Sequence, residues 1–340
     1  MIYCIVDNKG DIYMDKKSAE KWERVRTKVA ELKKGIAQSV VGQEKIVQQM
    51  LVSLLCNGHC LIVGVPGLAK TLLVSTLGKI LGLTFRRIQF TPDLMPMDIL
   101  GSEILQNADD GGKRKFEFFQ GPIFANLILA DEINRTPPKT QAALLEAMQE
   151  KQVTVSGKCM KLKEPFVVFA TQNPIEHEGT YPLPEAQLDR FFFNLLIDYP
   201  TMSEEKDIVL RTTGRGQAAP GHIISAEETI ELQEMVLDVP VPDHVLDYIL
   251  KLVDSSRPTS VNADDYIKQY VAWGAGPRAS QNLTRAAKAL ALLNGNPTAS
   301  IEEVREVVKP VLRHRIIPNY NATGEGITVE TIVEHLLQKA

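Results

Sequence analysis

One segment of the chain combines small residues with a lysine and a threonine in the order that phosphate binding requires. Backbone amides can wrap around phosphate groups only where the side chains are small and the loop is flexible. The segment follows an apolar run at 60–63 and opens a helical pattern, which places the amino end of a helix beside the anion. We therefore predict a nucleotide-binding loop formed by Gly64, Val65, Pro66, Gly67, Leu68, Ala69, Lys70, Thr71 and Leu72.

Two residues of this loop would carry its chemistry, and a third departs from the general pattern. Lys70 would contact the β- and γ-phosphates, and the hydroxyl of Thr71 would bind Mg²⁺. Ala69 stands where the general pattern has glycine, but alanine is also small, so we expect nucleotide binding to survive. The competing interpretation is a helix-opening turn with an incidental lysine. The strand, loop and helix context disfavours it.

Two further apolar runs end in polar residues. Asp131 and Glu132 follow the run at 127–130, and Asn173 follows the run at 166–170. Ligands bind at the carboxyl ends of parallel strands. We therefore expect Asp131 to orient the hydration shell of Mg²⁺ and Glu132 to polarise the attacking water as a general base. Asn173 would hydrogen-bond the water or the γ-phosphate, although a simple Asn-Pro turn is the alternative.

The elements that would position these residues follow an α/β pattern. Short apolar runs at 60–63, 85–90, 127–130, 166–170 and 191–197 alternate with helical patterns, the first of them at 16–38 and 43–56. Runs this short and apolar predict a doubly wound, five-stranded parallel sheet that is covered on both faces. Strand signals stop after residue 200. Helical patterns at 203–213, 225–238, 243–256, 277–294 and 300–313 then predict an all-helical lid domain.

These patterns predict three parts of the chain. Residues 1–35 would be a lead-in and a helix, with 1–15 only weakly structured. Residues 36–200 would form the α/β core, interrupted by hairpins at about 91–126 and 153–164, the first turning at 109–112. Residues 201–340 would form the helical lid, with a loop at 214–221.

The composition is that of an ordinary globular protein. Of the 340 residues, 44% are hydrophobic and 24% are charged, which excludes wholesale disorder. The net charge of −4 disfavours a nucleic-acid partner, because a DNA-binding protein usually carries a basic face. The sequence has no pattern of a signal peptide or membrane span, so we expect a cytoplasmic protein.

The four cysteines are too few for a disulfide framework in a chain of this length. Cys56, His59 and Cys60 offer three potential zinc ligands close together in the sequence. They lack a second ligand pair at the spacing of a zinc finger, and they run directly into an apolar strand. We therefore expect small buried thiols here rather than a structural zinc site.

The order of the motifs resembles Walker A, Walker B and sensor 1 of AAA+ ATPases, and more narrowly the MoxR family. The resemblance covers about residues 35–320. In this family alanine is usual before the Walker A lysine. The matching segments outside the phosphate-binding loop are Thr91–Gly101, Gly121–Asn126, Asp131–Arg135, Gln141–Glu150, Ala170–Pro174, Glu185–Phe191, Gly274–Arg278 and Leu312–Arg315.

The resemblance implies an activity and a set of partners. It implies Mg²⁺-dependent ATP hydrolysis by a homo-oligomeric, hexameric ring, coupled to chaperone-like remodelling, maturation or metal insertion of protein clients. Proteins with von Willebrand A domains are among the clients of such ATPases. A DNA-dependent motor and a nucleotide-dependent scaffold without turnover are the alternative functions.

The resemblance also implies roles for residues outside the phosphate-binding loop. Arg190 would be an arginine finger that reaches the γ-phosphate of the neighbouring subunit, and Arg135 is a rival for that role. Arg278 would be the sensor 2 residue, reaching from the lid onto the same nucleotide. The two hairpins resemble the helix-2 insert and the pre-sensor-1 hairpin. Their aromatic residues Phe116, Phe118 and Phe119 would either contact a partner or pack the insert onto its own domain.

Overall fold

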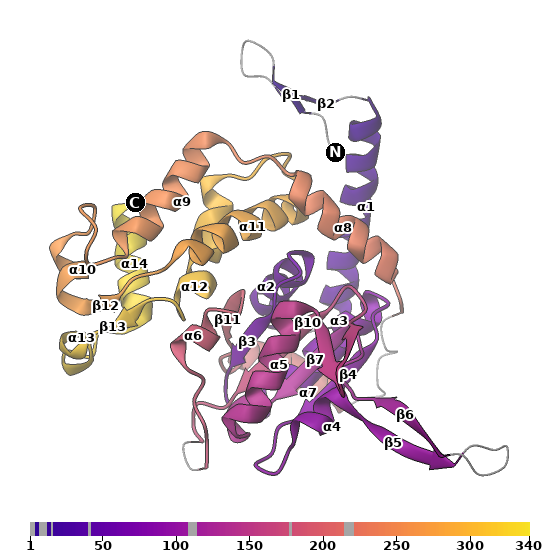
Figure 1. Cartoon of the computed structure of the whole chain (residues 1–340). Coiled ribbons are helices and arrows are strands. Elements are labelled where there is room, and N and C mark those ends of the chain that lie inside the picture. Colours follow the sequence, from indigo (N-terminus) through magenta and orange to yellow (C-terminus); the bar gives the residue numbers. More distant parts are fainter. Residues whose placement is uncertain are drawn as a thin grey trace.

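The computed structural model describes residues 4–6, 12–14, 16–39, 42–107, 114–176, 179–213 and 221–340. A parallel sheet with helices on both faces lies below a group of helices that continues to the carboxyl end (Figure 1). The sheet consists of five strands in the order β11-β3-β10-β7-β4, and every neighbouring pair is parallel. The predicted doubly wound, five-stranded sheet is therefore confirmed. Its strands are β3 (Cys60–Val63), β4 (Phe85–Gln89), β7 (Leu127–Asp131), β10 (Val167–Gln172) and β11 (Phe193–Leu196).

Alternate residues of the inner strands supply two separate apolar layers. On β7, Leu127 and Leu129 point into one layer, whereas Ile128 and Ala130 point into the other. The first layer includes residues of α1 (Lys16–Ser39), α2 (Glu44–Leu55) and α3 (Lys70–Ile80). The second includes residues of α5 (Pro138–Glu150). Burial on both faces explains why these strands are continuous apolar runs in the sequence.

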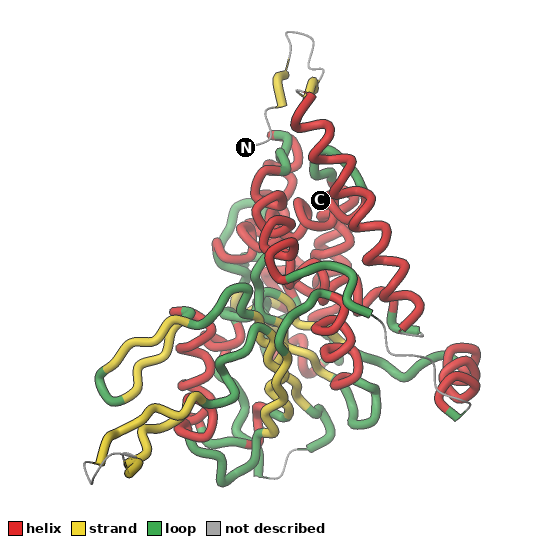
Figure 2. Tube along the Cα trace, turned by 90° about the vertical axis from the view of Figure 1, so that its right-hand side faces the viewer, coloured by secondary structure: helices red, strands yellow, loops and turns green. Residues whose placement is uncertain are grey.

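Two hairpins project from the same side of the sheet domain (Figure 2). The first follows α4 (Pro96–Leu100) and pairs β5 (Gly101–Asn107) with β6 (Arg114–Gln120). The second pairs β8 (Gln152–Val155) with β9 (Lys158–Lys161). An ion pair of 2.9 Å between Lys158 and Glu103 joins the two hairpins. Both hairpins were predicted, but the expected turn at 109–112 lies outside the described residues, and α4 was not expected.

The carboxyl-terminal part contains more elements than the sequence pattern indicated. Its predicted helices are α7 (Met202–Thr212), α8 (Ala226–Asp238), α9 (Asp243–Ser255), α11 (Pro277–Asn294) and α12 (Ile301–Leu312). The expected loop at 214–221 lies almost wholly outside the described residues. The unexpected elements are α10 (Asp265–Tyr270), β12 (Val271–Trp273), β13 (Ile317–Pro318), α13 (Tyr320–Gly324) and α14 (Val329–Lys339). The lid is therefore helical but also holds a small ribbon, because β12 and β13 pair antiparallel.

The amino-terminal residues also differ from the prediction. The sequence pattern predicted weak structure over 1–15, whereas β1 (Cys4–Val6) and β2 (Ile12–Met14) form a short antiparallel hairpin ahead of α1. Three-residue strands are too short to produce a recognisable alternation of apolar and polar residues. Among the described residues, no helix has the length and apolar character needed to cross a membrane.

The lid and the sheet domain share one apolar cluster, which runs from α2, α3 and β11 into α8, α9, α11 and α12. A buried arginine reinforces this contact. Arg315, which follows α12, donates from Nε to Asp189 at 2.8 Å and from Nη2 to the Phe191 carbonyl at 2.7 Å. Burial lowers the pKa of Arg315 to about 10, and Asp189 opposes that effect. The lid is thus tied to the chain that leads into β11, directly after α6 (Glu185–Leu188).

The three potential zinc ligands bond to protein atoms instead. Cys56 donates to the Arg285 carbonyl at 3.3 Å, and Cys60 donates to the Ser53 hydroxyl at 2.9 Å. Burial raises the pKa of both thiols to about 12, which agrees with the expectation of buried thiols. His59 accepts at Nδ1 from the Val168 amide, so its Nε2 carries the proton that is donated to the Met148 carbonyl at 3.0 Å.

His59 should make the stability of the fold depend on pH. Burial lowers its pKa to about 4, although the bond to Met148 opposes this. The unfolded chain has a higher pKa of about 6.5 and therefore takes up the proton first, so stability present above pH 6.5 is lost as the pH falls toward 4. We expect the free energy of unfolding to fall by about 2 kcal/mol through His59 between pH 7.5 and pH 5.

Urea unfolding at the two pH values measures this loss. His59→Gln keeps a polar side chain but cannot titrate, so the variant should lose about 2 kcal/mol less than the wild type over the same range. The buried His314 contributes equally to both proteins and cancels in the comparison. Equal losses in the two proteins would contradict the prediction.

Candidate functional site

The predicted phosphate-binding loop leaves the carboxyl end of β3 and leads into α3, as expected. Gly64 lies where this loop passes β11. A Cβ atom at Gly64 would come within 2.7 Å of the Ile197 carbonyl oxygen, so no larger residue fits there. Gly67 has a φ of 87°, which glycine adopts without strain, and a Cβ atom there would meet nothing within 4 Å. The backbone of the loop therefore remains open to a ligand at Gly67.

The amino end of α3 provides the charge that an anion needs. No side chain caps this end, so the first amide groups of α3 are available to a bound phosphate. Lys70 is the first residue of α3, and its ammonium group donates to the Gly64 carbonyl. Burial lowers the pKa of Lys70, whereas Asp131 and Glu132 act in the opposite direction. Lys70 is thus placed between the loop and the two predicted carboxylates.

Asp131 lies at the carboxyl end of β7, and both of its oxygen atoms accept hydrogen bonds. Oδ1 accepts from the Thr171 hydroxyl at 2.6 Å. Oδ2 accepts from Arg87 on β4, at 3.0 Å from Nε and 2.6 Å from Nη2. Neither Arg87 nor Thr171 was predicted from the sequence. Thr171 lies two residues before Asn173 in the same polar tip, a position that could have suggested it.

Glu132 is held in place by three other residues. Its backbone has a φ of 59°, and its amide donates to the Thr171 hydroxyl at 2.8 Å. Its Oε2 accepts from Gln89 on β4 and from Arg135, each at 2.9 Å. Arg135, the predicted rival for an action between subunits, therefore contacts a carboxylate of its own subunit.

Asn173 follows β10, the strand between β3 and β7. It is buried, and its Oδ1 accepts from the Ile175 amide at 3.1 Å, so its amide nitrogen is the group that can donate to a ligand. The local turn and the predicted contact with a phosphate or water are therefore compatible. The carboxyl ends of the parallel strands bring together Lys70, Asp131, Glu132 and Asn173.

The oxygen atoms at this edge fit Mg²⁺ bound together with a nucleotide. The predicted metal residues are Thr71, which is exposed at the start of α3, and Asp131. Mg²⁺ typically takes one or two protein carboxylates and completes its coordination with phosphate oxygens and water. The described residues contain no cluster of three or more histidines, cysteines or acids that could hold a metal alone, so the phosphates would be needed.

Arg190 and Arg278 lie at the opposite end of the sheet, where the parallel strands begin. Arg190 precedes β11 and is exposed, and Phe192 donates to the carbonyl of His59 at the amino end of β3. Arg278 pairs with Asp189 at 2.7 Å, so it lies beside Arg190. The structure does not bring Arg278 to the phosphate-binding loop of its own chain. Tertiary packing of the lid decides this position, and no sequence motif records it.

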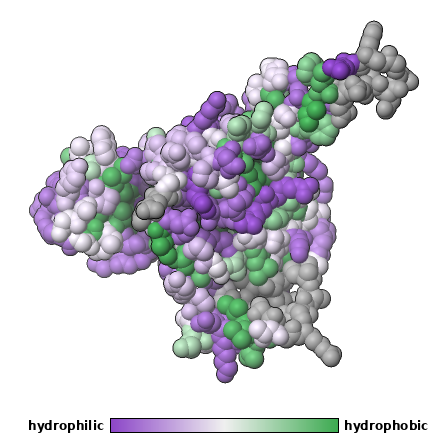
Figure 3. All heavy atoms as spheres, turned by 90° about the horizontal axis from the view of Figure 1, so that it is seen from below, coloured by the Kyte–Doolittle hydropathy of each residue, from purple (hydrophilic) through white to green (hydrophobic). Residues whose placement is uncertain are grey.

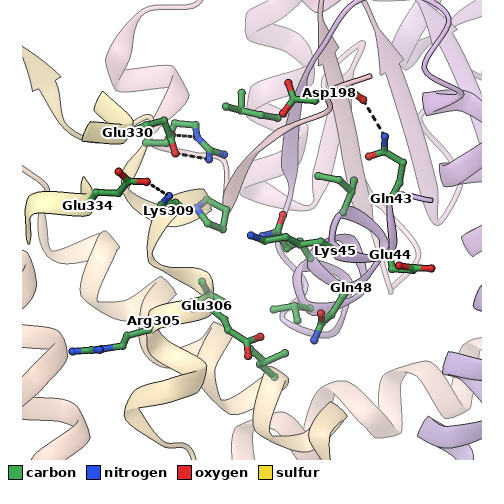
Figure 4. Close-up of a pocket in the computed structure, with 18 of the residues that line it drawn as sticks. Gln43, Glu44, Lys45, Gln48, Asp198, Arg305, Glu306, Lys309, Glu330 and Glu334 are labelled. Atoms are coloured by element: carbon green, nitrogen blue, oxygen red, sulfur yellow. Dashed lines mark hydrogen bonds and ion pairs between the residues drawn. The ribbon is translucent and has the colours of Figure 1, made fainter. Parts of the chain in front are cut away.

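A groove of about 1010 Å³ lies between the sheet domain and the lid (Figure 4). Its walls are α2, the residues after β11, α12 and α14. Gln43 donates to the carbonyl of Asp198 on the sheet-domain side, at the upper right of the view, and Lys309 pairs with Glu334 at 2.6 Å on the lid side. None of the residues 64–72 lines it, so this groove neighbours the predicted nucleotide site without containing it.

Comparisons with known proteins agree with this fold. Residues 59–193 match the family described as the ATPase family associated with various cellular activities (AAA), and residues 264–336 match the AAA lid domain. Chaperone MoxR1 of Mycobacterium tuberculosis is 44% identical over 89% of this chain and 79% of its own length. Protein YeaC of Bacillus subtilis is 42% identical over 89% of this chain and 91% of its own length.

A solved structure is also similar over nearly the whole chain. A crystal structure from Cytophaga hutchinsonii superposes with a TM-score of 0.89 and 42% sequence identity, covering 96% of this chain and 98% of that one. Protein MoxR of Paracoccus denitrificans is more distant, at 30% identity over 85% of this chain and 88% of its own length.

Ala69 should carry a strain that glycine would remove. Its φ of 54° is in the left-handed region, which costs a residue with a Cβ atom about 1 kcal/mol. We therefore expect Ala69→Gly to raise the free energy of unfolding by about 1 kcal/mol and to leave nucleotide affinity within about twofold. Chemical denaturation and nucleotide titration measure the two quantities.

Ala142 provides the matched control for this substitution. It is exposed in the interior of α5, where glycine should lower the free energy of unfolding by about 1 kcal/mol. Opposite signs at the two positions are expected. A loss of stability for both variants would show that the backbone at Ala69 is not strained.

Proposed function

Because the chain belongs to the MoxR family of AAA+ ATPases, we propose that it is a Mg²⁺-dependent ATPase that acts as a homo-oligomeric ring on protein clients. The observation that carries the proposal is the gathering of Lys70, Asp131, Glu132 and Asn173 at the carboxyl edge of one sheet. These side chains supply a phosphate-binding cation, a metal ligand, a general base and a hydrogen-bond donor. They are the groups that ATP hydrolysis requires.

The proposed reaction is an attack of water on the γ-phosphate. The amides of the loop and of the first turn of α3 hold the phosphates, and Lys70 neutralises charge on them. Mg²⁺, when bound by Thr71 and Asp131, supplies further charge neutralisation on the phosphate oxygens. Glu132 takes the proton of the attacking water, and the amide nitrogen of Asn173 donates a hydrogen bond to the water or phosphate.

The placement of two arginines supports action between subunits. Arg190 and Arg278 lie together at the edge of the sheet opposite the phosphate-binding loop, so neither serves the site of its own chain. In a ring, this edge of one subunit would face the nucleotide of the next, and the guanidinium groups would stabilise charge on its γ-phosphate. We infer that Arg190 is the finger, that Arg135 acts within its own subunit, and that the ring has six members, as the family resemblance implies.

The first hairpin is the surface we propose for contact with clients. Ile104, Leu105, Phe116 and Phe119 are exposed on it, and Figure 3 shows hydrophobic residues on this arm, beside the residues drawn in grey. Phe118, in contrast, is half-buried and packs edge-on against Phe124 at 5.9 Å. Contact with a partner thus remains available to Phe116 and Phe119. The name of the MoxR1 relative calls that protein a chaperone, and we propose protein clients, including von Willebrand A domain proteins, here.

Hydrolysis should depend on assembly and on Glu132. Because the finger comes from a neighbour, we expect the turnover per subunit to rise with protein concentration. Glu132→Gln should lower kcat by about 10²-fold or more, since the amide cannot accept the proton, while ATP affinity is retained. Phosphate release against protein concentration measures turnover, and a fluorescent nucleotide measures affinity. Turnover that does not depend on concentration would count against the ring, and binding without any turnover would favour a scaffold.

Mixing two inactive variants should restore activity if Arg190 acts across the interface. The Lys70→Ala variant cannot hydrolyse ATP in its own site but still offers Arg190 to its neighbour. The Arg190→Ala variant keeps an intact phosphate-binding loop but offers no arginine finger to its neighbour. In a random equal mixture, a complete site forms wherever an intact Lys70 faces an intact Arg190, so about a quarter of wild-type turnover should return.

The same mixture with Arg135→Ala provides the control. If Arg135 acts within its own subunit, Lys70→Ala and Arg135→Ala each damage a site that no neighbour can complete, so no activity should return. Recovery with Arg135→Ala and none with Arg190→Ala would reverse the assignment of the two arginines.

A further inference from the structure

Arg87 is hydrogen-bonded to the carboxylate of Asp131, which the proposed mechanism assigns to Mg²⁺. It lies in the middle of β4 and reaches across to the end of β7, where Nε and Nη2 both donate to Oδ2 of Asp131. The side chain of Asp131 is 16% exposed, whereas that of Arg87 is 48% exposed. Two nitrogen atoms of Arg87 therefore donate to one oxygen of a mostly buried carboxylate, the group that the proposed mechanism assigns to the cation.

The same guanidinium group fixes the orientation of Gln89. Nη2 of Arg87 donates to Oε1 of Gln89 at 2.6 Å. An arginine can only donate, so the carbonyl end of the Gln89 amide must face it, and the amino end faces Glu132, 2.9 Å away. Arg87 is thus connected to both acids, directly to Asp131 and through Gln89 to Glu132.

We propose that Arg87 is a positioning residue that weakens metal binding at Asp131. The inference rests on the proposed ATPase function and concerns the same site. A positive charge that shares a carboxylate with a cation repels that cation. At a separation of about 6 Å, the repulsion between one positive charge and a divalent cation changes an affinity by about tenfold even at the dielectric constant of water.

The neighbouring Arg86 provides a matched control. Side chains alternate along a strand, so Arg86 points to the opposite face of β4 from Arg87. Both arginines are exposed, and removal of either changes the net charge of the protein by the same amount. Only Arg87 contacts Asp131 and Gln89. A difference between the two variants therefore reports the contact and not the general field of the protein.

The test measures metal affinity directly, with Mn²⁺ as the probe. Free Mn²⁺ is followed by electron paramagnetic resonance while the full-length protein with saturating ADP is titrated. We expect Arg87→Met to bind Mn²⁺ about tenfold more tightly than the wild type and Arg86→Met to stay within about threefold. Arg87→Lys restores a positive charge and should return the affinity toward that of the wild type. Arg87→Gln replaces Arg87→Met if the latter does not fold.

The outcomes separate this inference from the proposed function. Unchanged or weaker Mn²⁺ binding in Arg87→Met, or an equal gain in Arg86→Met, would overturn it. Nucleotide affinity without metal, measured with a fluorescent ADP in the presence of a chelator, should be the same in all variants. Failure of the wild type to bind any nucleotide would instead remove the proposed ATPase function, and this inference with it.

Discussion

Both faces of the parallel sheet must be covered by apolar side chains, and the arrangement of the whole molecule follows from this requirement. Inner strands such as β7 and β10 alternate between two layers that are almost completely buried. Polar residues are excluded from the middle of such strands and appear only where the strands end. Because the strands are parallel, those ends meet at one edge, and Lys70, Asp131, Glu132 and Asn173 are gathered there. The apolar layer beneath α2 and α3 continues into the lid, so the lid is part of the same core.

The same burial explains which features the sequence could predict. Long apolar periodicities located the five strands and most of the longer helices to within a few residues, although α14, a helix of 11 residues, was missed. Short elements were missed, among them α10, α13 and the ribbon of β12 and β13, because two to six residues do not establish a period. The structure added Arg87 and Gln89 to the site. They lie on an edge strand, where charged and polar residues are usually only solvated.

The position of Arg278 illustrates a different limit. Its motif marks it as a candidate for nucleotide contact, but only the packing of the lid determines which edge of the sheet it reaches. The structure divides the candidate machinery between two edges, with the phosphate-binding loop and the acids on one and Arg190 and Arg278 on the other. Each acidic residue of the loop edge is already paired within its own chain, Asp131 with Arg87 and Glu132 with Arg135. Binding of a nucleotide and metal would therefore exchange existing ion pairs for new ones.

Asp189 connects the sheet domain to the lid, although its side chain is partly exposed. One of its oxygen atoms pairs with the buried Arg315 and the other with the half-exposed Arg278, while the next residue is Arg190. Loss of the carboxylate would leave the guanidinium group of Arg315 buried without its counter-ion, which is costly, and would also free Arg278. We therefore expect single exchanges at 189 or 315 to lower the stability of the contact between the lid and the core. The pair of residues 189 and 315 thus marks where the lid is attached to the core.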